Sequence, residues 1–176
     1  MSHADELKEQ GITFYSKQDY ESAIRSFREA KEAYEADHKE DMAAEMRVNI
    51  GLMHSSLGEP QLALDEMQAA LHVFQSEEDA LRMAQVLGNM GGVYLALNDK
   101  EQAYTAYRQA ADIFLQIDEM KMYGETLVAL GAMQLKDGKI SEGAAMYQVA
   151  LDYIDNPTTA QKIMKRLSGF INRLNG

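Results

Sequence analysis

The sequence predicts an all-α protein in which four pairs of helices stack into an α-solenoid and a ninth helix closes the stack. The main observation is an internal repeat, because glycines stand 40 residues apart without drift at Gly11, Gly51, Gly91 and Gly131. The second observation is that apolar residues around these glycines recur at steps of three and four, as on one face of a helix. A repeat of this length is typical of solenoids and related arrays.

Three further columns of residues keep the register of the glycines. A small residue follows each glycine by twelve positions, a bulky residue by sixteen and a second small residue by nineteen. In that order they are Ala23, Ala63, Ala103 and Gly143; Phe27, Met67, Tyr107 and Tyr147; and Ala30, Ala70, Ala110 and Ala150. A glycine inside a helix costs about 1 kcal/mol relative to alanine. We therefore expect these glycines to let the two helices of each pair approach closely.

Turn residues divide the chain into its elements. The two helices of each repeat are separated at Gln18-Asp19, Gly58-Glu59, Asn98-Asp99 and Gly138-Lys139. Glycine and asparagine tolerate the left-handed conformation that ends a helix, so three of these four junctions carry a good stop signal. Pro60 stands where a second helix begins, because its missing N–H costs little there. The predicted repeats of one domain over residues 1–176 are 4–40, 41–80, 81–120 and 121–156.

Residues 157–175 are predicted to form a capping helix. Asn156 can cap a helix that has Pro157 at its first position. The apolar residues of this segment would cover the open end of the last repeat, and its four basic residues would face water. The apolar residues are Leu167, Phe170, Ile171 and Leu174, and the basic ones are Lys162, Lys165, Arg166 and Arg173.

Composition narrows the function. The net charge of −11 argues against sequence-independent binding to nucleic acid, which depends on Lys and Arg. The sequence has no cysteine, no apolar run long enough to cross a membrane and no secretory signal, so we expect a cytoplasmic protein without membrane insertion. Its four histidines are scattered, and no catalytic constellation is visible. We expect no metal, no cofactor and no enzymatic activity.

The repeat resembles the tetratricopeptide repeat family. In the third copy, the matching pattern reads Leu87, Gly91, Tyr94, Ala103, Tyr107 and Ala110. The resemblance implies a right-handed solenoid that binds other proteins. The spacing of 40 residues is similar to the subgroup found in kinesin light chains, polarity adaptors and bacterial signal-responsive regulators. The second copy departs from the pattern at Arg47 and His54, which we expect to weaken the core locally.

The resemblance also implies a peptide-binding groove lined by the first helix of each repeat. The implied groove residues are Lys8, Ile12 and Tyr15 in the first copy; Glu45, Val48, Asn49 and Leu52 in the second; Gln85, Gly88, Asn89, Gly92 and Leu95 in the third; and Val128 and Ala132 in the fourth.

Two pairs of groove residues suggest how a partner is held. The carboxamides of Asn49 and Asn89 suit the backbone of an extended peptide, although each could equally bond to water or to a neighbouring helix. Gly88 and Gly92 lie on one face of their helix and could open a recess for an apolar side chain of the partner. Crowding against a neighbouring helix would explain these glycines as well.

The groove does not match the carboxylate clamp of chaperone-tail binders. Lys8 and Asn49 fit two of its places, but Ile12, Gln85 and Asn89 stand where that clamp needs another asparagine, a lysine and an arginine. We expect a protein or peptide partner with apolar anchors and flanking basic residues. The alternative is a self-assembling structural unit, in which the basic C-terminal segment contacts the acidic first repeat of another copy in a weak self-association.

Overall fold

Eight α-helices and no strand occur in the part of the chain that the computed structural model describes, residues 2–155, 158 and 162. This confirms the all-α prediction. The helices are α1 (His3–Ser16), α2 (Tyr20–Ala36), α3 (Glu40–Ser56), α4 (Pro60–Ser76), α5 (Ala80–Ala96), α6 (Lys100–Gln116), α7 (Met120–Lys136) and α8 (Ile140–Ala150). The predicted capping helix at residues 157–175 lies outside the described residues, apart from residues 158 and 162.

The same turn joins every pair of consecutive helices. Its middle residue has a positive φ, between 56° and 78°, at Gln18, His38, Gly58, Glu78, Asn98, Asp118 and Gly138. The N–H of the residue after it donates to a carbonyl five positions earlier, as from Glu59 to His54 at 2.9 Å. This is the Schellman arrangement, which satisfies the last carbonyls of a helix. The turn therefore recurs every 20 residues, between repeats as well as within them.

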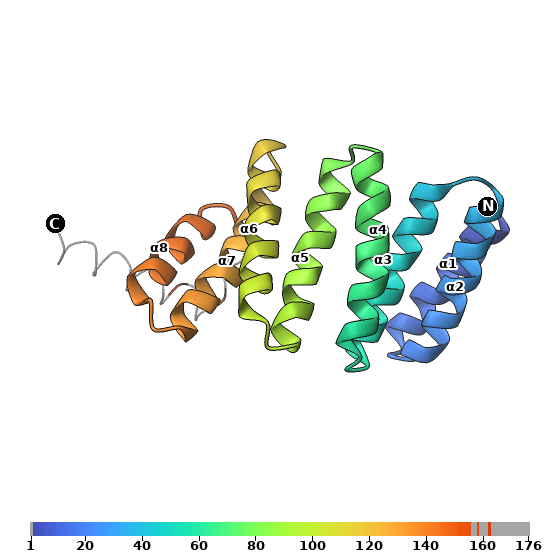
Figure 1. Cartoon of the computed structure of the whole chain (residues 1–176), viewed down its shortest axis with the longest axis horizontal. Helices are drawn as coiled ribbons and strands as arrows, with labels where there is room; N and C mark the ends of the chain where they lie inside the picture. The colour runs from blue at the N-terminus through green and yellow to red at the C-terminus, as the bar shows by residue number, and fades with distance from the viewer. Residues whose placement is uncertain (1, 156–157, 159–161, 163–176) are drawn as a thin grey trace. The chain divides into compact units, whose positions relative to one another are not determined.

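The chain divides into two compact units, Met1–Lys100 and Glu101–Gly176. In the first unit, α1 packs on α2, α2 on α3, α3 on α4 and α4 on α5, and α5 also contacts α3. In the second unit, α7 packs on α8. Figure 1 shows consecutive helices running in opposite directions within each unit. The boundary falls between the two helices of the third repeat, and the single domain over residues 1–176 stays a prediction.

The repeated glycines lie where two helices meet. A Cβ on Gly11 would lie 2.5 Å from the ring carbon Cε1 of Phe27, and one on Gly51 would lie 3.0 Å from the carbonyl oxygen of Ala63. A Cβ on Gly131 would lie 3.1 Å from the carbonyl oxygen of Gly143. Gly91 is also buried. The backbone of one helix thus sits directly against the small column of the next, as the columns predict.

The core of the first unit follows from this packing. One cluster joins α1, α2 and α3 around Phe27, Tyr34, Met46 and Ile50, and a second joins α3, α4 and α5 around Met67, Phe74, Val86 and Met90. In the second unit, Ala111, Leu127, Leu130 and Ala150 form a core.

No helix in the described residues combines the length and the apolar character needed to cross a bilayer.

Candidate functional site

The predicted groove residues of the first three copies lie on α1, α3 and α5, all in the first unit. We call these residues the first-helix surface. They are Lys8, Ile12, Tyr15, Glu45, Val48, Asn49, Leu52, Gln85, Gly88, Asn89, Gly92 and Leu95. Val128 and Ala132 lie on α7 in the second unit and are half-buried there. Helix α3 shares a core with α1 and also contacts α5, so α3 lies between the other two first helices.

An ion pair crosses the first-helix surface from α1 to α3. The Nζ atom of Lys8 lies 2.7 Å from Oε1 of Glu45, and both side chains are partly exposed. Sequence reasoning placed both residues on the surface but did not foresee this pairing. A partner that binds Glu45 through a basic residue must therefore share that carboxylate with Lys8.

The carboxylate of Asp5, at the start of α1, accepts hydrogen bonds that hold the fold together. The hydroxyl of the buried Tyr34 donates to Oδ1 of Asp5 at 2.7 Å, and the backbone N–H of Ser2 donates to Oδ2 at 2.8 Å. These bonds, the one from Tyr34 first, lower the pKa of Asp5 to about 2. Burial, and then the bond to Asp5, raises the pKa of Tyr34. Asp5 therefore fastens α1 to α2.

The two asparagines of the surface occupy equivalent positions on α3 and α5. Both side chains are half-buried. Neither makes a side-chain hydrogen bond with another described residue, whereas Lys8 and Asp5 on α1 are paired. Two carboxamides at equivalent positions of α3 and α5 thus keep donors and acceptors that no described residue uses.

Gly88 differs from the repeated glycines. A Cβ built on Gly88 would meet nothing within 4 Å, whereas one on Gly51 would touch the main chain of α4. Packing among the described residues therefore does not explain the glycine at position 88. Gly92, one turn later on α5, is exposed. The bare helix backbone at Gly88 leaves open space next to Asn89.

Exposed apolar side chains also occur along the first-helix surface. Ile12, Tyr15 and Leu95 are large apolar residues with 40%, 52% and 38% of their surface exposed. Val48 and Leu52 are half-buried and pack partly against the core. Gln85 is half-buried on the preceding turn of α5. The surface thus combines exposed apolar groups with two unpaired amides, a mixture suited to peptide recognition.

Arginines that cross between helices were missed or misjudged from the sequence. Arg47 lies 3.0 Å from Glu66 on α4 and 3.5 Å from Glu35 on α2, so a residue expected to weaken the core forms ion pairs between three helices. Arg82 lies 2.6 Å from Asp79 and 3.4 Å from Asp41 on α3. Its guanidinium also lies over the ring of Phe74. Sequence spacing gives no signal for Glu66, Glu35 or Asp41, because they come from separate helices. Asp79 stands three positions before Arg82, so that pair could have been predicted from spacing.

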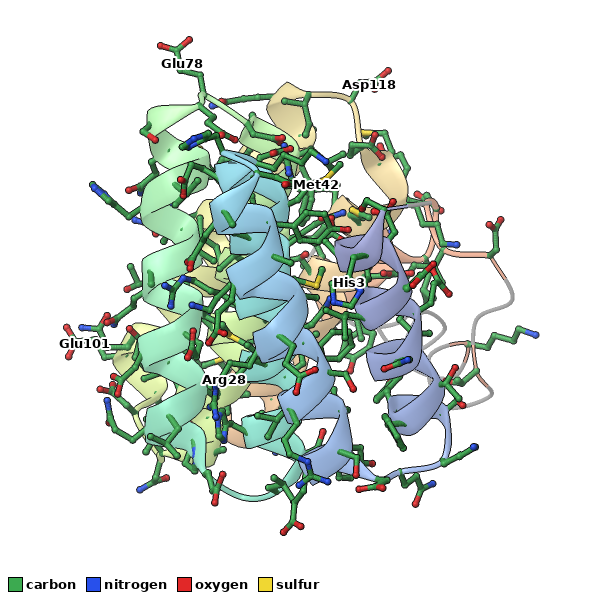
Figure 2. The ribbon with its side chains drawn as sticks, turned by 90° about the vertical axis from the view of Figure 1, so that its right-hand side faces the viewer. His3, Arg28, Met42, Glu78, Glu101 and Asp118 are labelled. Carbon is green, nitrogen blue, oxygen red and sulfur yellow. The ribbon has the colours of Figure 1, made fainter. Side chains whose placement is uncertain are left out.

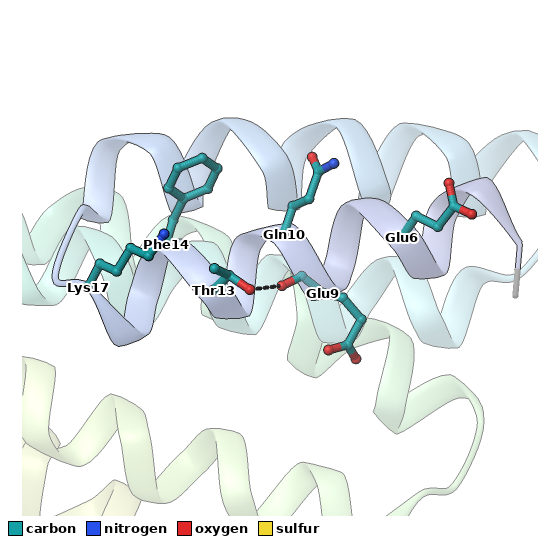
Figure 3. Close-up of a pocket in the computed structure, with 6 residues that line it drawn as sticks. All are labelled: Glu6, Glu9, Gln10, Thr13, Phe14 and Lys17. Atoms are coloured by element: carbon teal, nitrogen blue, oxygen red, sulfur yellow. Dashed lines mark hydrogen bonds between the residues drawn. The ribbon is translucent and has the colours of Figure 1, made fainter.

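A shallow depression of about 720 Å³ lies on the outer face of α1 (Figure 3). Its lining residues are Glu6, Glu9, Gln10, Thr13, Phe14 and Lys17. On α3, the positions equivalent to Glu6, Gln10 and Thr13 hold Met46, Ile50 and Met53, which are buried against α1 and α2. This face of α1 is therefore polar where the equivalent face of α3 is apolar and buried.

The described residues give no group of three His, Cys, Asp or Glu side chains placed to hold a metal ion. His54 is nearly buried, and its Nδ1 lies 2.7 Å from Oε2 of Glu59 at the start of α4. This histidine therefore joins two helices rather than standing in a cluster of ligands.

Part of the chain is similar to a known repeat family. Residues 42–116 match the family model for the tetratricopeptide repeat. The transcriptional activator NprA of Geobacillus stearothermophilus is 24% identical over 159 residues, which cover 90% of this chain and 39% of that protein. The chain thus spans about two fifths of the length of this relative.

Solved structures show the same fold at low sequence identity. The crystal structure of BtubC (BKLC) from P. vanneervenii is similar with a TM-score of 0.77 and 19% identity, covering 88% of this chain and 67% of that one. The Rap conjugation gene regulator of plasmid pLS20, in complex with the Phr* peptide, has a TM-score of 0.73 and 16% identity, covering 83% and 41%. The crystal structure of MamA has a TM-score of 0.65 and 18% identity, covering 86% and 78%.

Proposed function

We propose that this chain, whose residues 42–116 match the tetratricopeptide repeat model, is an adaptor that binds an extended segment of a partner protein on its first-helix surface. Repeats of this type are typically interaction modules without catalytic activity, and a cytoplasmic location is part of the proposal. The observation that carries it is the pair Asn49 and Asn89, two half-buried and unpaired carboxamides next to the bare backbone of Gly88.

The spacing of the two asparagines suits an extended chain. Neighbouring helices pack about 8–10 Å apart. An extended peptide advances about 3.3 Å per residue, so three residues span the distance from α3 to α5. Asn49 and Asn89 would then bond the partner's main chain about three residues apart, each with a carbonyl acceptor and amide donors.

The partner's side chains would supply the remaining contacts. An apolar side chain directed at α5 would enter the space beside Gly88 and Gly92, and Ile12, Tyr15 and Leu95 would cover its neighbours. Val128 and Ala132 on α7 stay predicted members of the same surface. Burying a side chain of the size of leucine yields about 1.5–3 kcal/mol, so one such anchor can dominate the affinity.

Charge favours a basic partner. Residues 1–100 contain nine basic and nineteen acidic side chains, a net charge of −10, whereas residues 101–176 contain eight basic and nine acidic ones, a net charge of −1. A basic segment would therefore be drawn to the first unit, and its association rate would fall as salt screens the attraction. The structure with the Phr* peptide is a similar fold that binds a peptide, which supports this class of ligand. What the longer relatives do beyond this is not carried over to this chain.

A combinatorial peptide display against the wild-type chain tests the proposal. The enriched peptide is then titrated, by fluorescence anisotropy, into wild type and the double variant Asn49→Ala, Asn89→Ala. Two lost hydrogen bonds of about 0.5–1.5 kcal/mol each predict an affinity loss of roughly 5- to 150-fold. The matched control is Gln68→Ala, Gln109→Ala, which removes two exposed carboxamides from second helices and should leave the affinity unchanged. Equal affinity in all three proteins would refute the assignment of the asparagines.

A second candidate function is self-assembly, and the depression on α1 is the observation that favours it. Glu6 and Glu9 line this depression, and the C-terminal segment 157–176 holds four basic residues and no acidic one. Contact of one copy's basic segment with another copy's α1 would be head-to-tail and would not close. Sedimentation at ionic strengths from about 0.01 M to 1 M tests this, because such an array dissociates as charges are screened. A monomer at the lowest salt excludes it.

A further inference from the structure

Three exposed leucines of the first unit lie at one end of its helices. Leu57 and Leu97 occupy the same turn position after α3 and after α5, and each is 38% exposed. Leu62 in the first turn of α4 is 47% exposed. We call these three residues the turn-edge patch. In Figure 1 the turns that carry them lie along the lower edge of the first unit.

The turns at the opposite ends of the same helices are charged. They read Asp37-His38-Lys39 and Glu77-Glu78-Asp79, without a large apolar residue, and Met42 in the first turn of α3 is the exposed apolar side chain beside them. Glu78 projects into solvent at that end in Figure 2. The contrast between the two ends is therefore a property of the sequence placed at each turn, because the backbone of the turns is the same.

The fold itself does not need leucine at these positions. Lys17 and Asp137 occupy the equivalent position after α1 and α7, and both take the same hydrogen-bonded turn. Since a charged residue serves equally well in the turn, exposed leucines at 57 and 97 call for another explanation. Exposed apolar patches on a folded chain commonly mark interaction sites.

We infer that the turn-edge patch is a second docking surface, separate from the first-helix surface, and that it binds a basic amphipathic helix of a partner protein. Helices α3 and α5 contact each other, so Leu57 and Leu97 are set apart by about the 8–10 Å of neighbouring helices. Residues seven apart on a helix are separated by about 10.5 Å, so two successive apolar residues of one face can cover both leucines.

Backbone hydrogen bonding selects a helix over an extended peptide at this edge. The N–H groups of Leu57, Gly58 and Glu59 already donate to carbonyls of α3, and those of Leu97, Asn98 and Asp99 donate to α5. An extended segment would find few main-chain partners for its own polar groups, whereas a helix satisfies its own. This distinguishes the patch from the surface around Asn49 and Asn89.

Charge selects a basic partner over a second copy of this chain. The acidic residue Glu59 is exposed in a turn of the patch, and the first unit carries −10 in total. An isologous contact would place two such units against each other and would be opposed by their charge. A helix with lysine or arginine beside its apolar face meets the opposite charge.

The test uses a stapled helical peptide of about two heptads, with leucine at the a and d positions and lysine elsewhere. A peptide of the same composition, stapled but scrambled to break the apolar face, is the peptide control. We expect the ordered peptide to bind the full chain, and Leu57→Gln, Leu97→Gln to weaken it at least tenfold. Leu115→Gln, which changes an exposed leucine of α6, and the Asn49→Ala, Asn89→Ala variant should bind as wild type does.

Amide NMR shifts upon titration locate the contact. Shifts confined to residues 57–62 and 97–99 support the inference. Equal binding of the ordered and scrambled peptides, or no loss in the Leu57→Gln, Leu97→Gln variant, would overturn it by showing simple attraction between charges. Shifts centred on Asn49 and Asn89 would overturn it as well, because one surface would then serve both ligands.

Discussion

Replacing Gly51 and Gly88 separately with alanine gives a matched test of how this fold is held together. Both glycines lie inside first helices of the first unit, so both gain the same helix propensity, about 1 kcal/mol, from the substitution. They differ only in what the new methyl group meets. At Gly88 it meets nothing within 4 Å, whereas at Gly51 it lies 3.0 Å from the carbonyl oxygen of Ala63 and 3.0 Å from Cγ of Met67.

The magnitudes follow from these contacts. Gly88→Ala should raise the free energy of unfolding by about 1 kcal/mol, or roughly 2–4 °C in Tm for a chain of this size. Forcing an extra methyl into a packed interface costs about 1–3 kcal/mol, so Gly51→Ala should range from neutral to about 2 kcal/mol less stable. The propensity gain cancels in the comparison. The difference between the two variants therefore measures the close approach of α3 and α4 alone.

Urea unfolding followed by circular dichroism provides the measurement. The transition midpoints are compared between variants that share the same dependence of the free energy of unfolding on urea concentration. Gly11→Ala serves as a further check, because its methyl would lie 2.5 Å from the ring of Phe27 and should destabilise as well. If Gly51→Ala stabilised the chain as much as Gly88→Ala, the glycine column would not mark a close helix contact, and the reasoning from the repeat would fail.

Two other predictions concern the turns and the start of the chain. Glu78→Gly should stabilise the fold by roughly 1 kcal/mol in thermal unfolding, because Glu78 has a φ of 56° and a left-handed conformation costs an L-residue about 1–2 kcal/mol; an unchanged or lower Tm would contradict this. Tyr34→Phe should raise the pKa of Asp5 from about 2 toward 3.8 in an NMR titration of its carboxyl carbon. A carboxyl group with a lowered pKa in the folded state stabilises the fold above its unfolded-state pKa, and this stabilisation is lost as the pH falls through its folded-state pKa. The variant should therefore lose less stability than wild type between about pH 4 and 2. An unchanged pKa of Asp5 in the variant would show that Tyr34 is not its main partner.

Much of the fold could be predicted because the repeat places equivalent residues in equivalent surroundings. The turns at Gly58, Asn98 and Gly138 could be predicted, because glycine and asparagine tolerate a positive φ. Gln18, His38, Glu78 and Asp118 adopt the same left-handed conformation without such a signal, since the hydrogen bonds of the helix end impose it. Residue type therefore predicts a turn only where the position with positive φ holds a residue that adopts this conformation with little strain, such as glycine or asparagine.

The candidate site could be predicted by position but not by pairing. The repeat register placed Lys8, Glu45, Asn49 and Asn89 on first helices, where the structure has them. Whether each is engaged depends on contacts between helices, such as Lys8 with Glu45 across 37 residues. The same limit applies to Arg47, whose ion pairs reach two other helices. Spacing along the chain carries no information on such contacts.

The most direct measurement of the proposed function observes the side-chain amide groups of Asn49 and Asn89 by NMR while the display-selected peptide is added. The proposal predicts that both pairs of N–H₂ resonances shift together at the stoichiometric point and show nuclear Overhauser effects to the peptide's main chain. Unchanged Asn49 and Asn89 resonances, with the peptide bound and shifts elsewhere, would contradict it.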